Sequence, residues 1–132
     1  MKISVDTNVL VRAVVRDNER EALIAAKLLK EAELICVSLP CLCEFVWVLR
    51  RVYNFGQQDI SAALEALLNA KNVAVNRAAA DAGLAILKDG GDFADGLIAY
   101  EGNWLGGETF VSFDKKAVSL IAKQGKQATL LA

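Results

Sequence analysis

The chain of 132 residues contains no histidine, one proline and three cysteines. Without an imidazole, neither a Ser-His-Asp nor a Cys-His catalytic site can form, and the side chain that most often transfers protons near neutral pH is missing. Any hydrolysis by this protein must therefore depend on carboxylates or on a metal ion.

The three cysteines, Cys36, Cys41 and Cys43, are odd in number and cannot all pair in disulfides. Their spacing, with no histidine to add, supplies fewer than the four ligands of a structural zinc site. We therefore expect free thiols that act as small apolar side chains, which is typical of a reducing compartment.

Long hydrophobic runs are also missing. The densest apolar stretch, residues 34–49, is interrupted by Pro40 and Glu44, and a membrane span needs about 18 to 20 uninterrupted apolar residues. The first residues lack the apolar region of a secretory signal. We expect a cytoplasmic protein.

Apolar residues as a whole are abundant, at 55% of the chain, against roughly 45–50% in an average soluble domain. A chain of this length buries about two-thirds of its surface when it folds as one unit, and no linker, repeat or low-complexity segment divides it. We predict a single domain over residues 1–132, with part of its apolar surface covered by a partner.

Short apolar runs alternate along the chain with segments of helical periodicity. This alternation is typical of right-handed βαβ units and predicts an α/β fold whose central parallel sheet is covered by helices on both faces. Asn18 with Glu21 predicts the start of a helix, and Gly90-Gly91 the end of one. The predicted strands are residues 3–5, 34–37, 73–75, 109–113 and 127–131, and the predicted helices are residues 9–14, 18–30, 41–53, 60–68, 77–88, 92–100 and 114–123.

Several aspartates stand directly after predicted strands or at the starts of predicted helices. Asp6 and Asp114 each come directly after a predicted strand, and ligand sites of open α/β sheets lie at the carboxyl ends of the strands. Asp92 and Asp95 lie within one helical turn and face the same way. Each aspartate is also a good helix cap, so a purely structural role is the alternative for each one alone.

Glu44 lies in the most apolar predicted helix, where an ionised carboxylate is costly to bury unless a cation or donor compensates it. Five acids at one sheet edge would repel one another strongly, and a divalent cation relieves such repulsion. Ligation by oxygen alone favours Mg²⁺ or Mn²⁺ over zinc. The predicted ligands are Asp6, Glu44, Asp92, Asp95 and Asp114, and the residues predicted to orient them are Thr7, Asn8 and Ser112.

Four segments stand in a recognisable order: Asp6-Thr7-Asn8-Val9-Leu10, Glu44, Asp92-Phe93-Ala94-Asp95-Gly96-Leu97-Ile98-Ala99 and Ser112-Phe113-Asp114-Lys115. In this order they resemble PIN-domain nucleases and, within them, the VapC-type toxins of bacterial and archaeal toxin-antitoxin pairs. The resemblance makes Asp6, Glu44, Asp95 and Asp114 the catalytic, metal-binding acids. Asp92 matches an additional acid of some members. Gly96 stands where many members have a larger residue, and we expect it to loosen its helical turn.

The resemblance implies a three-layer α/β/α sandwich with a central parallel sheet. It also implies Mg²⁺-dependent endoribonuclease activity, homodimerisation and neutralisation by a cognate antitoxin. This activity agrees with the missing histidine, because a metal ion can generate hydroxide from water near neutral pH without a general base.

A net charge of −1 taken alone argues against RNA binding, which normally uses Lys and Arg. Setting aside the five proposed site acids leaves 11 acidic against 15 basic side chains, a net charge of +4 for the remainder. Some of the basic residues are expected to hold RNA, and exposed helix faces or antitoxin contacts are the alternative for each. The RNA-binding candidates are Arg12, Arg16, Arg50, Arg51, Lys115 and Lys116, and Arg20 continues the spacing of the first two.

The helix predicted over residues 41–53 carries more apolar residues than a one-sided helix needs, including Phe45, Trp47 and Val48. We expect part of it to contact a second copy or an antitoxin helix.

Two other functions stay open. A phosphoaspartyl receiver domain also binds Mg²⁺ at a sheet edge, but it needs an acceptor Asp after the third strand, where Asn76 stands, and an acid pair after the first, where Asp6 is alone. The other is a catalytically silent module that keeps the fold and only binds a partner.

Overall fold

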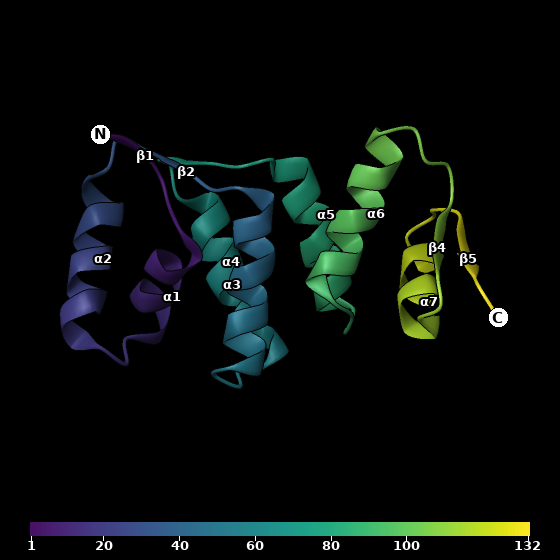
Figure 1. The fold of residues 1–132 in the computed structure, drawn as a ribbon, viewed down its shortest axis with the longest axis horizontal. Coiled ribbons are helices and arrows are strands. Elements are labelled where there is room, and N and C mark those ends of the chain that lie inside the picture. Colours follow the sequence, from purple (N-terminus) through teal and green to yellow (C-terminus); the bar gives the residue numbers. More distant parts are fainter. The chain divides into compact units, whose positions relative to one another are not determined.

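A computed structural model describes all 132 residues and divides them into two compact units, Met1–Asn76 and Arg77–Ala132. Each unit has its own parallel strands and its own helices, in the order shown in Figure 1. The expectation of a single domain stays a prediction. None of the seven helices is long and apolar enough to cross a lipid bilayer.

The first unit is built on a three-stranded parallel sheet of β1 (Lys2–Ser4), β2 (Leu34–Cys36) and β3 (Val73–Ala74), in that order. Ile35 in the middle strand pairs with Ile3 on one side and Val73 on the other. Each neighbouring pair of strands is joined through two helices. The first connection uses α1 (Thr7–Val15) and α2 (Glu19–Glu31), and the second uses α3 (Leu39–Arg51) and α4 (Gln57–Asn69).

The starts of these helices follow from their capping residues. The Asn18 side chain accepts a hydrogen bond from the Glu21 amide at 3.1 Å and so begins α2, as predicted. The Glu21 carboxylate does not complete the reciprocal capping box, because it is paired with Arg12. Helix α3 begins after Ser38 and carries Pro40 in its first turn, where a missing amide proton costs nothing.

The core of the first unit contains large side chains with almost no exposure, namely Leu10, Ile35, Leu42, Phe45, Leu49, Ile60 and Leu64. Phe45 is only 1% exposed, so the expectation that it contributes to a partner surface is wrong. The residues 45, 46 and 49 lie with 41 and 42 on one helix face, and that face is already covered by the unit's own core.

The second unit contains α5 (Arg77–Lys88), α6 (Phe93–Trp104), β4 (Phe110–Ser112), α7 (Lys115–Lys123) and β5 (Ala128–Leu130). The two strands pair in parallel, with Phe110 opposite Ala128. These two residues pack on a buried cluster of Ile86, Ala99, Leu120 and Ile121.

The turn between α5 and α6 is set by two glycines. Gly90 has φ of 92°, a left-handed conformation that favours glycine, and its amide donates to the Leu87 carbonyl. The Gly91 amide donates to the Ile86 carbonyl at 2.9 Å. This pair of bonds is a Schellman motif, so the predicted helix end is confirmed.

Gly96 has a packing role that the sequence analysis interpreted wrongly. A Cβ at Gly96 would lie 2.5 Å from the Ala82 carbonyl oxygen and 2.9 Å from Gly83 Cα. The missing side chain therefore allows α5 and α6 to approach closely. It does not loosen the helical turn, as we had expected.

The α/β class and the parallel strand pairing are confirmed. The hydrogen bonds group the five strands differently from the expected single central sheet: three strands pair in the first unit and two in the second. Observed strands are also two or three residues long, shorter than predicted at most ends, because the flanking residues enter turns and helix caps.

Candidate functional site

The first group of candidate residues lies just beyond the carboxyl end of β1. Asp6 is the N-cap of α1, and its Oδ1 accepts a hydrogen bond from the Thr7 amide at 2.8 Å. The rest of the carboxylate is exposed to solvent. Asp6 thus acts as a cap and still has oxygen lone pairs available for a ligand.

Thr7 connects this strand end to α3. Its side chain is only 8% exposed, and its hydroxyl donates to Glu44 Oε1 at 3.2 Å. The same hydroxyl oxygen lies 3.7 Å from Cys41 Sγ. Because Thr7 bonds Asp6 through its amide and Glu44 through its hydroxyl, the structure brings these two predicted ligands together, as expected for an orienting residue.

Glu44 itself is exposed, and the expectation of a buried carboxylate is wrong. The apolar face of α3 contains Cys41, Leu42, Phe45, Val46 and Leu49. At about 100° per residue, Glu44 points roughly 130° away from the centre of that face. The apolar residues next to Glu44 in sequence therefore do not surround it in space.

Burial raises the pKa of the Cys41 thiol, a hydrogen bond from Thr7 acts in the opposite direction, and the charges of Asp6 and Glu44 raise it further. Cys41 is therefore a protonated, buried thiol. Cys36 is exposed and Cys43 is half-buried, so the expectation of small core side chains holds for Cys41 alone.

The second group lies in the second unit, around the start of α6. Asp92 is the N-cap of this helix, and its Oδ1 accepts a hydrogen bond from the Ala94 amide at 3.2 Å. Asp95 follows in the first turn and is half-buried. Burial raises the pKa of Asp95, and the negative charges of Asp92 and Asp114 raise it further. Asp95 is therefore close enough to Asp92 and to Asp114 for their negative charges to repel its own.

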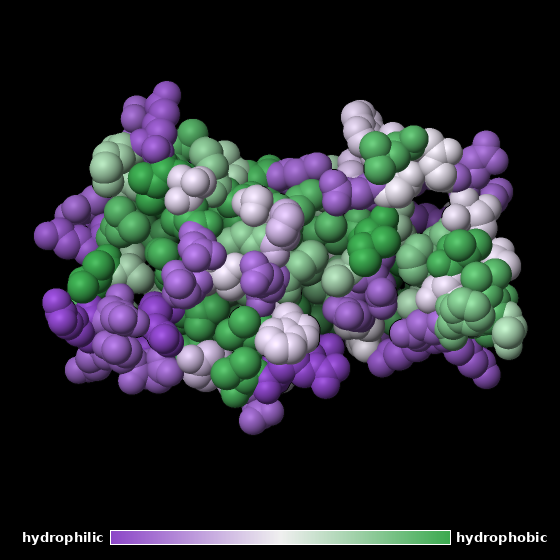
Figure 2. Space-filling model, in the orientation of Figure 1, coloured by the Kyte–Doolittle hydropathy of each residue, from purple (hydrophilic) through white to green (hydrophobic).

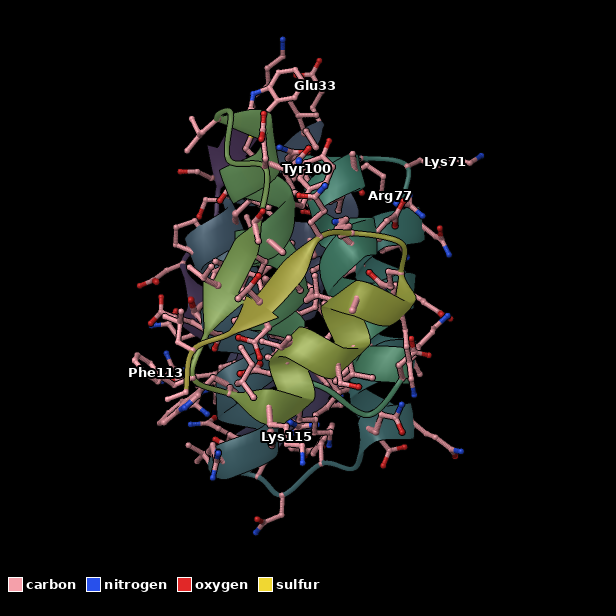
Figure 3. All side chains as sticks on the ribbon, turned by 90° about the vertical axis from the view of Figure 1, so that its right-hand side faces the viewer. Glu33, Lys71, Arg77, Tyr100, Phe113 and Lys115 are labelled. Atoms are coloured by element: carbon pink, nitrogen blue, oxygen red, sulfur yellow. The ribbon has the colours of Figure 1, made fainter.

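Asp114 follows β4 and caps α7. Its Oδ1 accepts hydrogen bonds from the Lys116 and Ala117 amides at 3.0 and 3.1 Å. Its own amide donates to Ser112 Oγ at 2.9 Å, which places the predicted orienting serine directly beside it. Figure 3 labels Phe113, directly after the end of β4, and Lys115, at the start of α7, on either side of Asp114.

The donor chemistry of these groups fits a hard divalent cation, because carboxylate oxygens are the ligands that Mg²⁺ and Mn²⁺ prefer. Within neither unit do three carboxylate or thiol side chains lie close enough to hold one ion. Burial is the main cause of the raised pKa of Asp95, and the charges of Asp92 and Asp114 add a repulsion that a bound cation would relieve. The assignment of the five acids as ligands stays a prediction, as does the orienting role of Asn8, which is exposed in the first turn of α1.

The basic candidates differ in whether their side chains are paired with acids of the same unit. Arg12 is paired within the first unit: its guanidinium contacts Glu21 at 2.6 Å and Asp17 at 3.2 Å and also donates to the Tyr53 hydroxyl at 3.3 Å. Its role as an RNA contact stays a prediction. Figure 2 shows hydrophilic residues gathered over the turn between α1 and α2, at the lower left.

The other basic candidates lie at helix ends. Arg16 ends α1 in a left-handed conformation with φ of 60°. Lys116 Nζ lies at the glycine turn before α6, 4.0 Å from the position that a Cβ at Gly90 would take. Arg51 and Lys115 are exposed, and Arg50 is half-buried.

Two features of the site escaped the sequence analysis. One is the contact of Cys41 with Thr7, which joins residues far apart in sequence and leaves no local signal. The other is the outward direction of Glu44 and Trp47 on α3. The helical positions of the apolar residues around them carried that information.

Comparison with known families gives one match. The family model described as PIN domain matches residues 3–122, which includes every candidate acid and parts of both units. No curated protein and no solved structure matches the chain. The seven helices and the parallel strands agree with the three-layer α/β/α fold of this family.

Proposed function

The chain belongs to the PIN domain family, whose members are typically metal-dependent nucleases, and we propose that it is a Mg²⁺-dependent endoribonuclease. We also propose that it is the toxin of a toxin-antitoxin pair, as the resemblance of its four segments to VapC-type toxins suggests. Manganese is the alternative metal, because it takes the same oxygen ligands.

The observation that carries this proposal is the placement of the half-buried Asp95 beside Asp92 and Asp114: burial raises the pKa of Asp95, and the negative charges of both neighbours raise it further. Helix capping explains Asp92 and Asp114, but it does not explain why a third, half-buried carboxylate stands against them. Charge repulsion of this kind is typical of functional sites that await a cation.

The proposed chemistry assigns each group a task. When bound, the divalent ion supplies a nucleophile from water and stabilises charge on the phosphate. As the resemblance implies, Asp6, Glu44, Asp95 and Asp114 would hold the ion, with Asp92 as the additional acid. Thr7 keeps the Glu44 carboxylate in place through its hydroxyl, and Ser112 fixes the turn that carries Asp114. Such orienting contacts typically change metal affinity or activity by about 10- to 100-fold.

The proposed partners are RNA, a cognate antitoxin and a second copy of the chain, in the cytoplasm. Exposed apolar side chains support protein partners, because Leu23 and Ile24 of α2 are 61% and 59% exposed. The proposed RNA contacts are the exposed Arg51 and Lys115, with Arg12, Arg16, Arg50 and Lys116.

The proposal is tested by incubating the protein with single-stranded RNA in Mg²⁺ or in EDTA. We expect internal cleavage in Mg²⁺ only, and a loss of at least ~100-fold in the Asp6→Asn variant, as is common when a charge-stabilising group is removed. Asp59→Asn, an acid in the first turn of α4 outside the site, is the matched control and should cleave normally. Equal cleavage in EDTA would refute the proposal, and no cleavage under any condition would favour the silent binding module.

A further inference from the structure

Helix α3 carries an outward face of mixed chemistry that the core does not use. Glu44, Trp47 and Arg51 are all exposed, and Trp47 is 59% exposed. At about 100° per residue, Trp47 lies within roughly 60° of the other two side chains around the helix axis. A carboxylate, an indole and a guanidinium therefore follow one another along a single line of α3.

Core packing does not explain this tryptophan. The buried face of α3 is formed by Cys41, Leu42, Phe45, Val46 and Leu49, and Trp47 points roughly 170° away from the centre of that face at 100° per residue. Tryptophan is highly buried on average, so a ring that stands opposite the core on a structured helix is unusual.

We propose that Trp47 stacks on a base of single-stranded RNA while Arg51 pairs with a neighbouring phosphate, so that this face of α3 guides the strand to Glu44. The proposal rests on the proposed ribonuclease function. Along α3 the three residues are separated by about 4.5 Å and about 6 Å, steps comparable to one or two nucleotides of a strand stacked at about 3.4 Å per nucleotide.

The charges on both sides of Trp47 favour RNA over a protein partner. Glutamate is depleted at interfaces between proteins, whereas Glu44 lies one turn from Trp47 on the same face of α3. Proteins that bind single strands combine aromatic platforms for the bases with cations for the backbone. A duplex hides the base faces, so the platform selects unpaired RNA. The sequence analysis had assigned Trp47 to a protein partner, and the outward direction of Glu44 changes that assignment.

The test compares Trp47→Ala and Trp47→Phe with Trp104→Ala. Trp104 is 81% exposed at the end of α6 and is the matched control, since it lies outside the α3 face. All three are made on an Asp114→Asn background, which removes one proposed metal ligand and allows binding to be measured without cleavage. Fluorescence anisotropy then gives the Kd of each for a labelled single-stranded oligoribonucleotide.

We expect Trp47→Ala to weaken binding by roughly 5- to 150-fold, the range that corresponds to the loss of one base stack. Trp47→Phe should recover most of the affinity, and Trp104→Ala should leave it unchanged. A blunt-ended RNA duplex, which has no unpaired base, should bind equally to all variants. The melting temperature of Trp47→Ala should stay near that of its parent, because the side chain is outside the core.

Unchanged RNA affinity in Trp47→Ala would overturn the proposal while leaving the nuclease function intact, provided that the wild-type protein cleaves RNA. An equal loss in Trp104→Ala would also overturn it, because the effect would not belong to the α3 face. A shift in sedimentation of Trp47→Ala without a loss of RNA affinity would assign the ring to a protein contact instead. Absence of both binding and cleavage in the wild-type protein would refute the proposed function and this inference together.

Discussion

The close approach of α5 and α6 gives a sharp prediction at Gly96, whose helix also carries Asp92 and Asp95. In Gly96→Ala, the new methyl group would lie 2.5 Å from the Ala82 carbonyl oxygen and 2.8 Å from Ile86 Cγ1. The first of these contacts is with backbone, so a side-chain rotation cannot relieve it. The two helices must separate.

The size of the effect follows from two opposing terms. Overpacking a well-packed contact costs about 1–3 kcal/mol and sometimes more, and replacing glycine by alanine inside a helix contributes up to about 1 kcal/mol in favour of folding. The backbone clash should dominate, so we expect a net loss of about 1–2 kcal/mol. For a domain of this size, that loss lowers Tm by roughly 3–10 °C.

Gly102 in the same helix is the matched control, because a Cβ there meets nothing within 4 Å. Thermal unfolding followed by circular dichroism should show a lower Tm for Gly96→Ala and an equal or higher Tm for Gly102→Ala. If both variants raise Tm to the same extent, the close helix contact does not exist and the reasoning is refuted.

Three further predictions concern charge and hydrogen bonding. Asp95→Asn should raise the Tm of the metal-free protein at pH 7. Because the pKa of Asp95 is raised in the folded state, its ionised form disfavours folding above that pKa, and this penalty fades as the pH falls. A gain in Tm that persists unchanged at pH 3 would contradict this cause. In urea unfolding, Ser61→Ala should leave stability unchanged or raise it by about 1 kcal/mol, because the buried Ser61 hydroxyl has no hydrogen-bond partner. A loss of stability greater than about 1 kcal/mol would show that the hydroxyl does have a partner. Tyr53→Phe should lower stability by about 1 kcal/mol or less. It removes a hydroxyl at a solvent-exposed site that contacts Arg12 and donates to Asp17 at 3.1 Å. A Tm equal to that of the wild type would mean that these contacts are not formed in solution.

Local signals in the sequence were enough to predict most of the secondary structure. Helix α5 has the predicted bounds, because an apolar helical period runs up to the Gly90-Gly91 stop. The caps at Asn18, Asp92 and Asp114 were visible for the same reason: a short polar side chain stands just before a helical pattern. Both strands of the second unit were found, but their ends were placed too far out.

What failed in each case depends on contacts between elements. The burial of Glu44 was judged from its sequence neighbours, although the direction of a side chain on a helix is set by its angle to the buried face. Gly96 was judged as a property of one helix, although Ala82 and Gly83 on the neighbouring helix require it. The contacts of Arg12 with Asp17, Glu21 and Tyr53 were not foreseen, because its spacing from other arginines says nothing of its partners.

The sequence predicted which residue types form the candidate site better than it predicted how those residues are arranged in space. Acids that follow strands and open helices are visible in sequence, and the structure places Glu44 with Thr7 and Asp95 with Asp92 and Asp114. The Thr7–Glu44 contact depends on the rotation of α3 against the end of β1, which no local pattern encodes.

The central claim is that the candidate acids serve metal-dependent cleavage of RNA. The most direct measurement is the rate of single-stranded RNA cleavage in Mg²⁺ for Asp6→Asn from the first unit and Asp95→Asn from the second, with Asp59→Asn as control. The account predicts that each of the first two variants loses at least ~100-fold in rate while keeping its fold, and that the control does not. Full activity in either Asp6→Asn or Asp95→Asn would contradict it.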